Sequence, residues 1–221
     1  MALLSIGCSP VFAPPVRTAH FGAPGRLAPG KVEVAAASSG VVAPVGMLGG
    51  NVGYAARRNL IVQAGVDGSF DEFALAWGGV QVPGKLQLSR RWSLAADAEL
   101  GLGGGIGGRK VCDDRDDCVD DELRWYQRPA GGAYLGAGGA VRLGPVSLYS
   151  RVRTQLTGAR GVPSTQWSSV ALGLHGHILE RADVWVGYAL AHYANGVDSY
   201  SGCVPEIGLA FRFDPYLGWR R

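Results

Sequence analysis

The sequence predicts an all-β fold, an up-and-down antiparallel barrel of about ten strands, and three observations support it. Apolar and polar residues alternate strictly in many segments; between Trp92 and Leu102, every second residue is apolar. About ten such segments follow one another from residue 31 to residue 213. The connections between them alternate in length, as expected when short turns lie at one end of a barrel and long loops at the other.

Length and composition agree with one β domain. The chain has 221 residues, of which 18% are charged and 35 are glycine, and all-β domains often reach ~200–250 residues. The net charge of +3 is small and Lys/Arg residues do not cluster, so a nucleic-acid partner is not expected. No apolar run reaches ~18 residues, so a transmembrane helix is not expected either.

The first 30 residues lack strand periodicity. The opening "MALLSIGC" resembles a bacterial lipoprotein signal at Leu4, Ile6, Gly7 and Cys8. This resemblance implies lipidation of Cys8; the alternative is a free cysteine in a leader. Residues 9–30 hold five of the 12 prolines, which predicts an extended, unpacked linker. The predicted organisation is therefore a signal-like segment and linker (1–30), a barrel (31–214) and a short tail (215–221).

The predicted strands justify the barrel in order. They lie near residues 31–39, 49–57, 59–67, 77–88, 91–103, 133–143, 146–157, 168–179, 183–193 and 204–213. Most are close to the ~9–11 residues with which a tilted strand crosses a bilayer. Gly78, Gly79, Pro83 and Gly84 interrupt the fourth segment. Eight strands therefore remain an alternative.

The connections are the second argument. Short turns are expected at 57–59, 89–91, 144–145 and 180–182, and long loops at 40–48, 68–76, 104–132, 158–167 and 194–203. This segregation is typical of outer-membrane barrels. The chain is similar to the small barrels of the opacity and OmpA-like class, and the expected location is a bacterial outer membrane with the N-terminus in the periplasm.

The last predicted strand carries a further resemblance. "EIGLAFRF" resembles the insertion signal of outer-membrane barrels, with matching residues at Glu206, Gly208, Phe211 and Phe213. The resemblance implies recognition by the barrel-insertion machinery. One departure is that the chain continues past Phe213, whereas the family usually stops at the final aromatic residue.

The polar faces of the strands are expected to point inward. They are rich in glycine and alanine, which suits a narrow interior, and their charges have both signs, so that they can neutralise one another across the lumen. The expected lumen charges are Glu33, Asp97, Glu99, Arg142, Arg151, Arg153, Glu206 and Arg212. Aromatic residues near strand ends, such as Trp77 and Trp92, are expected in interfacial girdles. The opposite polarity, apolar side inward, would describe a soluble lipocalin-like ligand-binding barrel, because both solutions share the period of two.

The longest predicted loop, 104–132, is acidic. Cys112 and Cys118 are close enough for a disulfide, whereas Cys203 has no obvious partner. Carboxylates at Asp113, Asp114, Asp116 and Asp117 make this loop a weak Ca²⁺ candidate. The spacing is not that of an EF-hand, and the alternative is a solvated acidic tip.

His175 and His177 should both point into the lumen from one strand. They are similar to the barrel-strand histidine of lipid A deacylases, but the serine expected beside it is missing. Motifs such as Gly-x-Ser-x-Gly and His-Glu-x-x-His are also missing. The sequence therefore predicts neither an enzyme nor a cofactor.

Two functions follow. The first is a structural or surface-interaction barrel that exposes the acidic loop to an extracellular macromolecule, in contact with outer-membrane lipid and lipopolysaccharide. The second is a narrow channel for small solutes. We favour the first, because open pores belong to ~16–18 strands.

Overall fold

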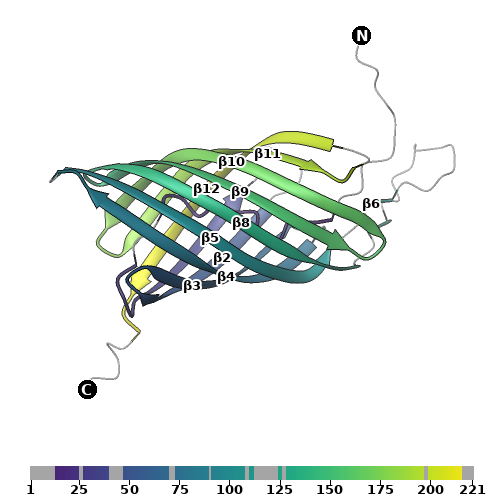
Figure 1. The fold of residues 1–221 in the computed structure, drawn as a ribbon, viewed down its shortest axis with the longest axis horizontal. Coiled ribbons are helices and arrows are strands. Elements are labelled where there is room, and N and C mark those ends of the chain that lie inside the picture. The colour runs from purple at the N-terminus through teal and green to yellow at the C-terminus, as the bar shows by residue number, and fades with distance from the viewer. Residues whose placement is uncertain are drawn as a thin grey trace, which may run out of the picture.

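The computed structural model is a closed antiparallel barrel of ten strands (Figure 1). It describes residues 13–24, 27–39, 47–69, 73–89, 91–107, 110–111, 124–125, 128–196 and 199–215. The barrel strands are β1 (Val32–Ser39), β2 (Met47–Arg57), β3 (Leu60–Ser69), β4 (Phe73–Gln87), β5 (Trp92–Gly107), β8 (Arg128–Leu143), β9 (Val146–Ala159), β10 (Val162–Leu179), β11 (Ala182–Ala194) and β12 (Ser199–Phe213). Within these ranges no helix is long and apolar enough to cross a membrane.

The topology is the predicted up-and-down order. Each strand pairs with the next along the barrel, and β1 closes the ring against β12, with Val32 opposite Phe213. In the sequence, two short strands come between β5 and β8: β6 (Lys110–Val111) and β7 (Arg124–Trp125). They pair with each other and do not join the barrel. All ten predicted strands are confirmed, so the eight-strand alternative is wrong.

The fourth strand, β4, is continuous although glycine and proline residues interrupt its sequence pattern. β4 runs unbroken through Pro83, which lies opposite Asp97 of β5. On its other side β4 pairs with β3 only as far as Gln81. Pro83 therefore sits where the strand has a neighbour on one side only, a position that tolerates a residue without an N–H.

The short-turn end of the barrel agrees with the predicted connections, whereas the other end does not. At the short-turn end, the connections 58–59, 88–91, 144–145 and 180–181 match the predicted turns closely. At the other end, the loop end, strands continue further than their alternation suggested. The predicted long loop 158–167 is wrong, because β9 and β10 are joined by residues 160–161 alone. The register of β10 shifts between Val162 and Thr165, around Pro163, and this irregularity hid the strand.

The barrel wall has the polarity predicted for a membrane barrel. Asp97 and Glu99 are buried in the lumen, whereas Leu94 and Leu100 are exposed on the outer wall. Outward residues along every strand are predominantly apolar, and more than two dozen large ones are exposed. Such a wall would be insoluble in water, so the lipocalin-like alternative is wrong.

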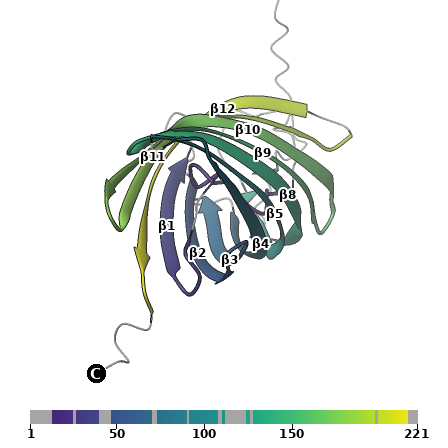
Figure 2. The ribbon, with the colours of Figure 1, turned by 60° about the vertical axis from the view of Figure 1, so that its left-hand side comes forward.

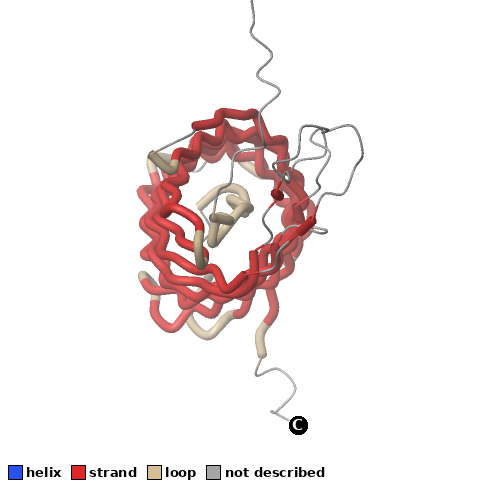
Figure 3. Tube along the Cα trace, turned by 90° about the vertical axis from the view of Figure 1, so that its right-hand side faces the viewer, coloured by secondary structure: helices blue, strands red, loops and turns tan. Residues whose placement is uncertain are grey.

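The segment before β1 shows the largest difference between the predicted and the observed structure. Figure 3 looks along the barrel and shows a non-strand segment inside the ring of strands, and Figure 2 shows it from a second direction. Val16, Arg17 and His20 are buried there. The predicted unpacked linker is therefore wrong for residues 13–24, which we call the lumen segment.

The lumen segment runs lengthwise through the barrel. At its start, Ala13 bonds to Thr165, close to the 160–161 turn of the loop end. After it, Gly30 and Lys31 bond to Ala55, close to the 58–59 turn of the short-turn end. The chain then reverses into β1. Ala13 thus lies at the end opposite the short turns.

Candidate functional site

The candidate site is the occupied lumen, in which wall side chains hold the backbone of the lumen segment. Gln155 brackets Arg17: its carbonyl accepts from the Arg17 N–H at 2.9 Å and its amide donates to the Arg17 carbonyl at 2.8 Å. The Glu206 carboxylate accepts from the N–H groups of His20 and Phe21, at 2.7 and 3.0 Å. These bonds satisfy backbone groups that would be costly if buried without partners.

Further wall groups extend the same pattern. Asp67 accepts from the N–H and the hydroxyl of Thr18. Arg153 donates to the Ala19 carbonyl at 2.9 Å and Arg151 to the Gly22 carbonyl. Near the loop end, the Ala13 N–H donates to the Thr165 hydroxyl, and the Trp167 indole donates to the Ala13 carbonyl at 2.9 Å. The donors and acceptors come from β3, β9, β10 and β12, so the segment is held from several sides.

The electrostatic centre of the lumen is Glu99. Its carboxylate pairs with Arg17 at 2.8 Å, Arg153 at 2.9 Å and Arg151 at 3.1 Å. Asp97 supplies a second anion to Arg151 at 3.1 Å. All these side chains are almost completely buried. Buried ions are tolerable only when they are paired in this way.

Arg17 is also enclosed by aromatic rings. Its guanidinium carbon lies 4.1 Å from the centroid of the Trp77 ring and 5.4 Å from that of Tyr134. Phe21 of the same segment packs between Trp77 and Trp185, with centroids 6.3 and 6.2 Å apart. Trp77 is thus a lumen residue, and its predicted place in an interfacial girdle is wrong. Cation–π contacts gain strength where water is excluded.

Aromatic side chains of the lumen cover several glycines of the wall. Tyr149 covers Gly173 and Gly187, where an added Cβ would come within 2.7 and 2.6 Å of its ring and hydroxyl. Trp185 covers Gly208 in the same way. Rings over strand glycines bury surface that glycine leaves open. The inward glycines therefore make room for specific rings.

A histidine cluster closes the lumen near the short-turn end. Asp183 contacts His175 at 3.1 Å, His177 at 2.6 Å and the guanidinium of Arg212. Arg212 also pairs with Glu33 at 3.0 Å. The three potential ligand atoms of His175, His177 and Asp183 lie within 4.8 Å of one another, which raises the question of a metal site.

The hydrogen bonds of this cluster argue against a cation. The Ala23 N–H donates to Nδ1 of His175 at 3.2 Å, so the network assigns the proton to Nε2, the atom that faces Asp183. A metal at Nε2 would require the other tautomer, with two N–H groups facing each other. The positive charge of Arg212 on the same carboxylate would repel a metal as well. The cluster is therefore a hydrogen-bonded polar end of the lumen, in which Arg212 pairs with both Asp183 and Glu33.

The predicted lumen charges are mostly brought together. Glu33, Asp97, Glu99, Arg151, Arg153, Glu206 and Arg212 all take part in the lumen contacts described above. Arg142 is the exception, because its side chain donates to the Gly144 carbonyl at the short-turn end. Phe211 and Phe213 of the predicted insertion signal point outward.

Sequence reasoning missed four of the charged or titratable residues of the site. Arg17 and His20 lie in a segment without periodicity, and Asp67 and Asp183 are inward charges at strand positions that the lumen analysis omitted. The alternation within β3 and β11 carried the signal for the two aspartates. Nothing comparable existed for the lumen segment.

The acidic loop and most cysteines fall outside the described residues. These include Cys8, Cys112, Cys118 and the four candidate Ca²⁺ ligands Asp113, Asp114, Asp116 and Asp117. Within the described part, Cys203 is a free, exposed thiol. The β6–β7 ladder pairs Lys110 with Trp125.

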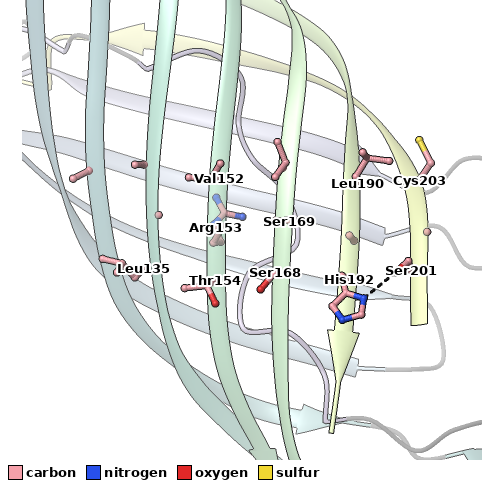
Figure 4. Close-up of a pocket in the computed structure, with 16 residues that line it drawn as sticks. Leu135, Val152, Arg153, Thr154, Ser168, Ser169, Leu190, His192, Ser201 and Cys203 are labelled. Carbon is pink, nitrogen blue, oxygen red and sulfur yellow. Dashed lines mark hydrogen bonds between the residues drawn. The ribbon is translucent and has the colours of Figure 1, made fainter. Parts of the chain in front are cut away.

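The outer wall has open depressions rather than an enclosed site. One, of about 990 Å³, is lined by residues of β8 to β12 and by Ala98 of β5 (Figure 4). Polar side chains cross it in register toward the loop end: Thr154 is opposite Ser168, and Ser168 is opposite His192. His192 bonds to Ser201 at 2.8 Å. These polar groups lie on the part of the outer wall nearest the loop end, whereas the rest of the depression is largely apolar.

No family model and no curated protein matches the chain. Solved structures of outer-membrane barrels are similar to it. The N-terminal β-barrel domain of Pseudomonas aeruginosa OprF is 12% identical, with 85% of this chain and 100% of that chain covered and a TM-score of 0.42. The NanC porin is 9% identical, with coverage of 81% and 98% and a TM-score of 0.41. A de novo designed transmembrane β-barrel is 12% identical, with coverage of 85% and 99% and a TM-score of 0.37.

Proposed function

We propose that this protein is an outer-membrane barrel with a structural or surface-interaction role, whose lumen is closed by its own N-terminal segment. The membrane location follows from the polarity of the wall. Outward leucines, valines and aromatic residues suit hydrocarbon, and the buried charges face inward, where they find partners.

The observation that carries the proposal is the occupied lumen. Residues 13–24 fill its length, and the enclosed space beside Arg17, Gln63 and Glu99 is about 30 Å³. A space of that size holds about one water molecule. A narrow channel for small solutes would require the lumen segment to leave.

The orientation proposal follows from the connections. If the long acidic loop faces the exterior, as is usual in such barrels, the short turns face the periplasm and Ala13 lies toward the cell surface. We therefore place the start of the lumen segment outside, instead of the periplasmic N-terminus expected from sequence. Lipidation of Cys8 stays a prediction from the resemblance of its flanking residues.

The partners remain proposals of the same kind. The apolar wall would contact lipid and lipopolysaccharide, and the strand that ends in Phe211 and Phe213 would be read by the barrel-insertion machinery. The loop at 104–132 would contact an extracellular macromolecule. A non-enzymatic role is likewise part of the proposal.

Two measurements test this proposal. Membrane fractionation with cold and heated gel electrophoresis should recover the protein in the outer membrane, with a migration that changes on boiling. Reconstituted protein in a planar bilayer should show no steady conductance. Recovery in the soluble fraction would overturn the membrane location, and a large steady conductance would favour the channel.

A further inference from the structure

The lumen segment is held by side chains of the wall and not by the backbone ladder of a strand. None of the backbone–backbone hydrogen bonds found in the described chain joins residues 13–24 to the wall. Its backbone bonds go to wall side chains instead, from Thr165 at the loop end to His175 near the short-turn end. A segment held in this manner can leave without breaking the ladder of the barrel.

The wall recognises the backbone of this segment more than its side chains. N–H groups of Ala13, Arg17, Thr18, His20, Phe21 and Ala23 donate to wall groups, and carbonyls of Ala13, Arg17, Ala19 and Gly22 accept from them. Several of these residues are alanine or glycine, which offer no other polar group. Side chains add fewer contacts. Arg17 pairs with Glu99, the Thr18 hydroxyl donates to Asp67, Nε2 of His20 lies 3.0 Å from the Ser169 hydroxyl, and Phe21 packs between Trp77 and Trp185.

Two wall side chains are directed at this segment. Gln155 and Glu206 are almost fully buried. The oxygen and the nitrogen of the Gln155 amide both bond to the segment, and so do the two carboxylate oxygens of Glu206. If the segment left, Glu206 would keep the hydrogen bond from the Trp185 indole, and water would have to replace the bonds that the segment supplies. The placement of Gln155 and Glu206 suits a polypeptide segment that follows the same path, with a residue that tolerates a positive φ at the position of Gly22.

We propose that the lumen is a binding channel for a polypeptide segment, recognised mainly through its backbone, and that residues 13–24 are its resident and exchangeable occupant. The bound polypeptide runs with its N-terminal end toward the loop end, as Ala13 does. The inference rests on the proposed membrane barrel, but it adds a ligand class: a second polypeptide segment that replaces the resident one.

Gly22 allows the resident segment to be displaced without altering the wall. Its φ of +71° disfavours other residues, and an added Cβ would lie 2.7 Å from Nδ1 of His175 and 2.9 Å from Cγ of Trp185. Gly22→Val should therefore expel the segment. Gly30→Val is the matched control, because Gly30 has a φ of +80° but open space around it.

The experiment measures conductance of full-length variants in planar bilayers, with synthetic peptides added. Gly22→Val should conduct intermittently, whereas Gly30→Val should stay closed. A peptide of residues 13–24 should block the open variant. Thr18→Ala in that peptide should weaken the block at most about tenfold, because the Thr18 N–H remains. N-methylation at Arg17, His20 and Phe21 should weaken it at least a hundredfold.

Each outcome decides one part of the proposal. Equal block by the N-methylated peptide would overturn backbone recognition. If Gly22→Val does not fold, Arg17→Ala takes its place, since Arg151 and Arg153 still neutralise Glu99. An open variant that no peptide blocks, or two variants that stay closed and bind no labelled peptide, would overturn exchange. Failure of the membrane location would appear separately, in the fractionation.

Discussion

Leu100 and Glu99 are neighbours on β5, yet the first is 57% exposed on the outer wall and the second is 2% exposed in the lumen. Apolar residues of the outer wall can replace one another, because lipid hydrocarbon makes no directional contacts and requires only an apolar side chain. In the lumen each charge has named partners, because no solvent replaces a missing one. The comparison teaches that the outer face tolerates exchange within a class, whereas the inner face depends on particular residues.

The sharpest test of this comparison is Glu99→Gln. Three guanidinium groups would lose their shared anion in a buried place, and the expected cost is about 3–5 kcal/mol of unfolding free energy. Denaturant titration of the barrel in lipid vesicles, followed by heat-modifiable migration, measures it. Glu180→Gln, at an exposed turn position, should cost less than about 0.5 kcal/mol. Equal costs would show that the lumen network does not stabilise the barrel.

Removing a lumen ring should have a similar or slightly smaller effect. Trp185→Ala empties the space over Gly208 and removes the indole bond to Glu206, at an expected cost of roughly 3–5 kcal/mol. Trp185→Phe keeps most of the ring and should cost less than half as much in the same titration. If alanine is tolerated as well as phenylalanine, the lumen is more plastic than its packing indicates.

For the outer wall, the test compares one substitution at two depths in the membrane. Leu135→Arg places a charge near the middle of β8 on the lipid side and should cost ~2–4 kcal/mol. Leu143→Arg, also outward but at the short-turn end of the same strand, should cost only ~0–1 kcal/mol. Folding yield into vesicles compares the two. The reverse order would contradict the membrane polarity of the wall.

The smallest effect on folding is expected at the acidic loop. Replacement of Cys112 and Cys118 by serine opens at most a short ring, because only five residues separate them. Heat-modifiable migration should stay unchanged, while limited proteolysis should cut the loop faster. A variant that does not insert would show that the loop belongs to the folding core.

The sequence by itself determined which residues of each strand share a face. The side-chain period of two assigned Asp97 and Glu99 to one face and Leu94 and Leu100 to the other, and the short gaps between alternating segments located the short connections. These are local properties, set by the geometry of a strand over a few residues.

Only the tertiary structure decided what fills the lumen. Residues 13–24 carry no periodicity, and their partners are far away along the chain: Phe21 bonds to Glu206, 185 residues later. Pairings of that kind arise only when barrel closure brings ten inner faces around one axis. The same closure converts a proline-rich segment, which would be solvated in isolation, into the buried occupant of the barrel.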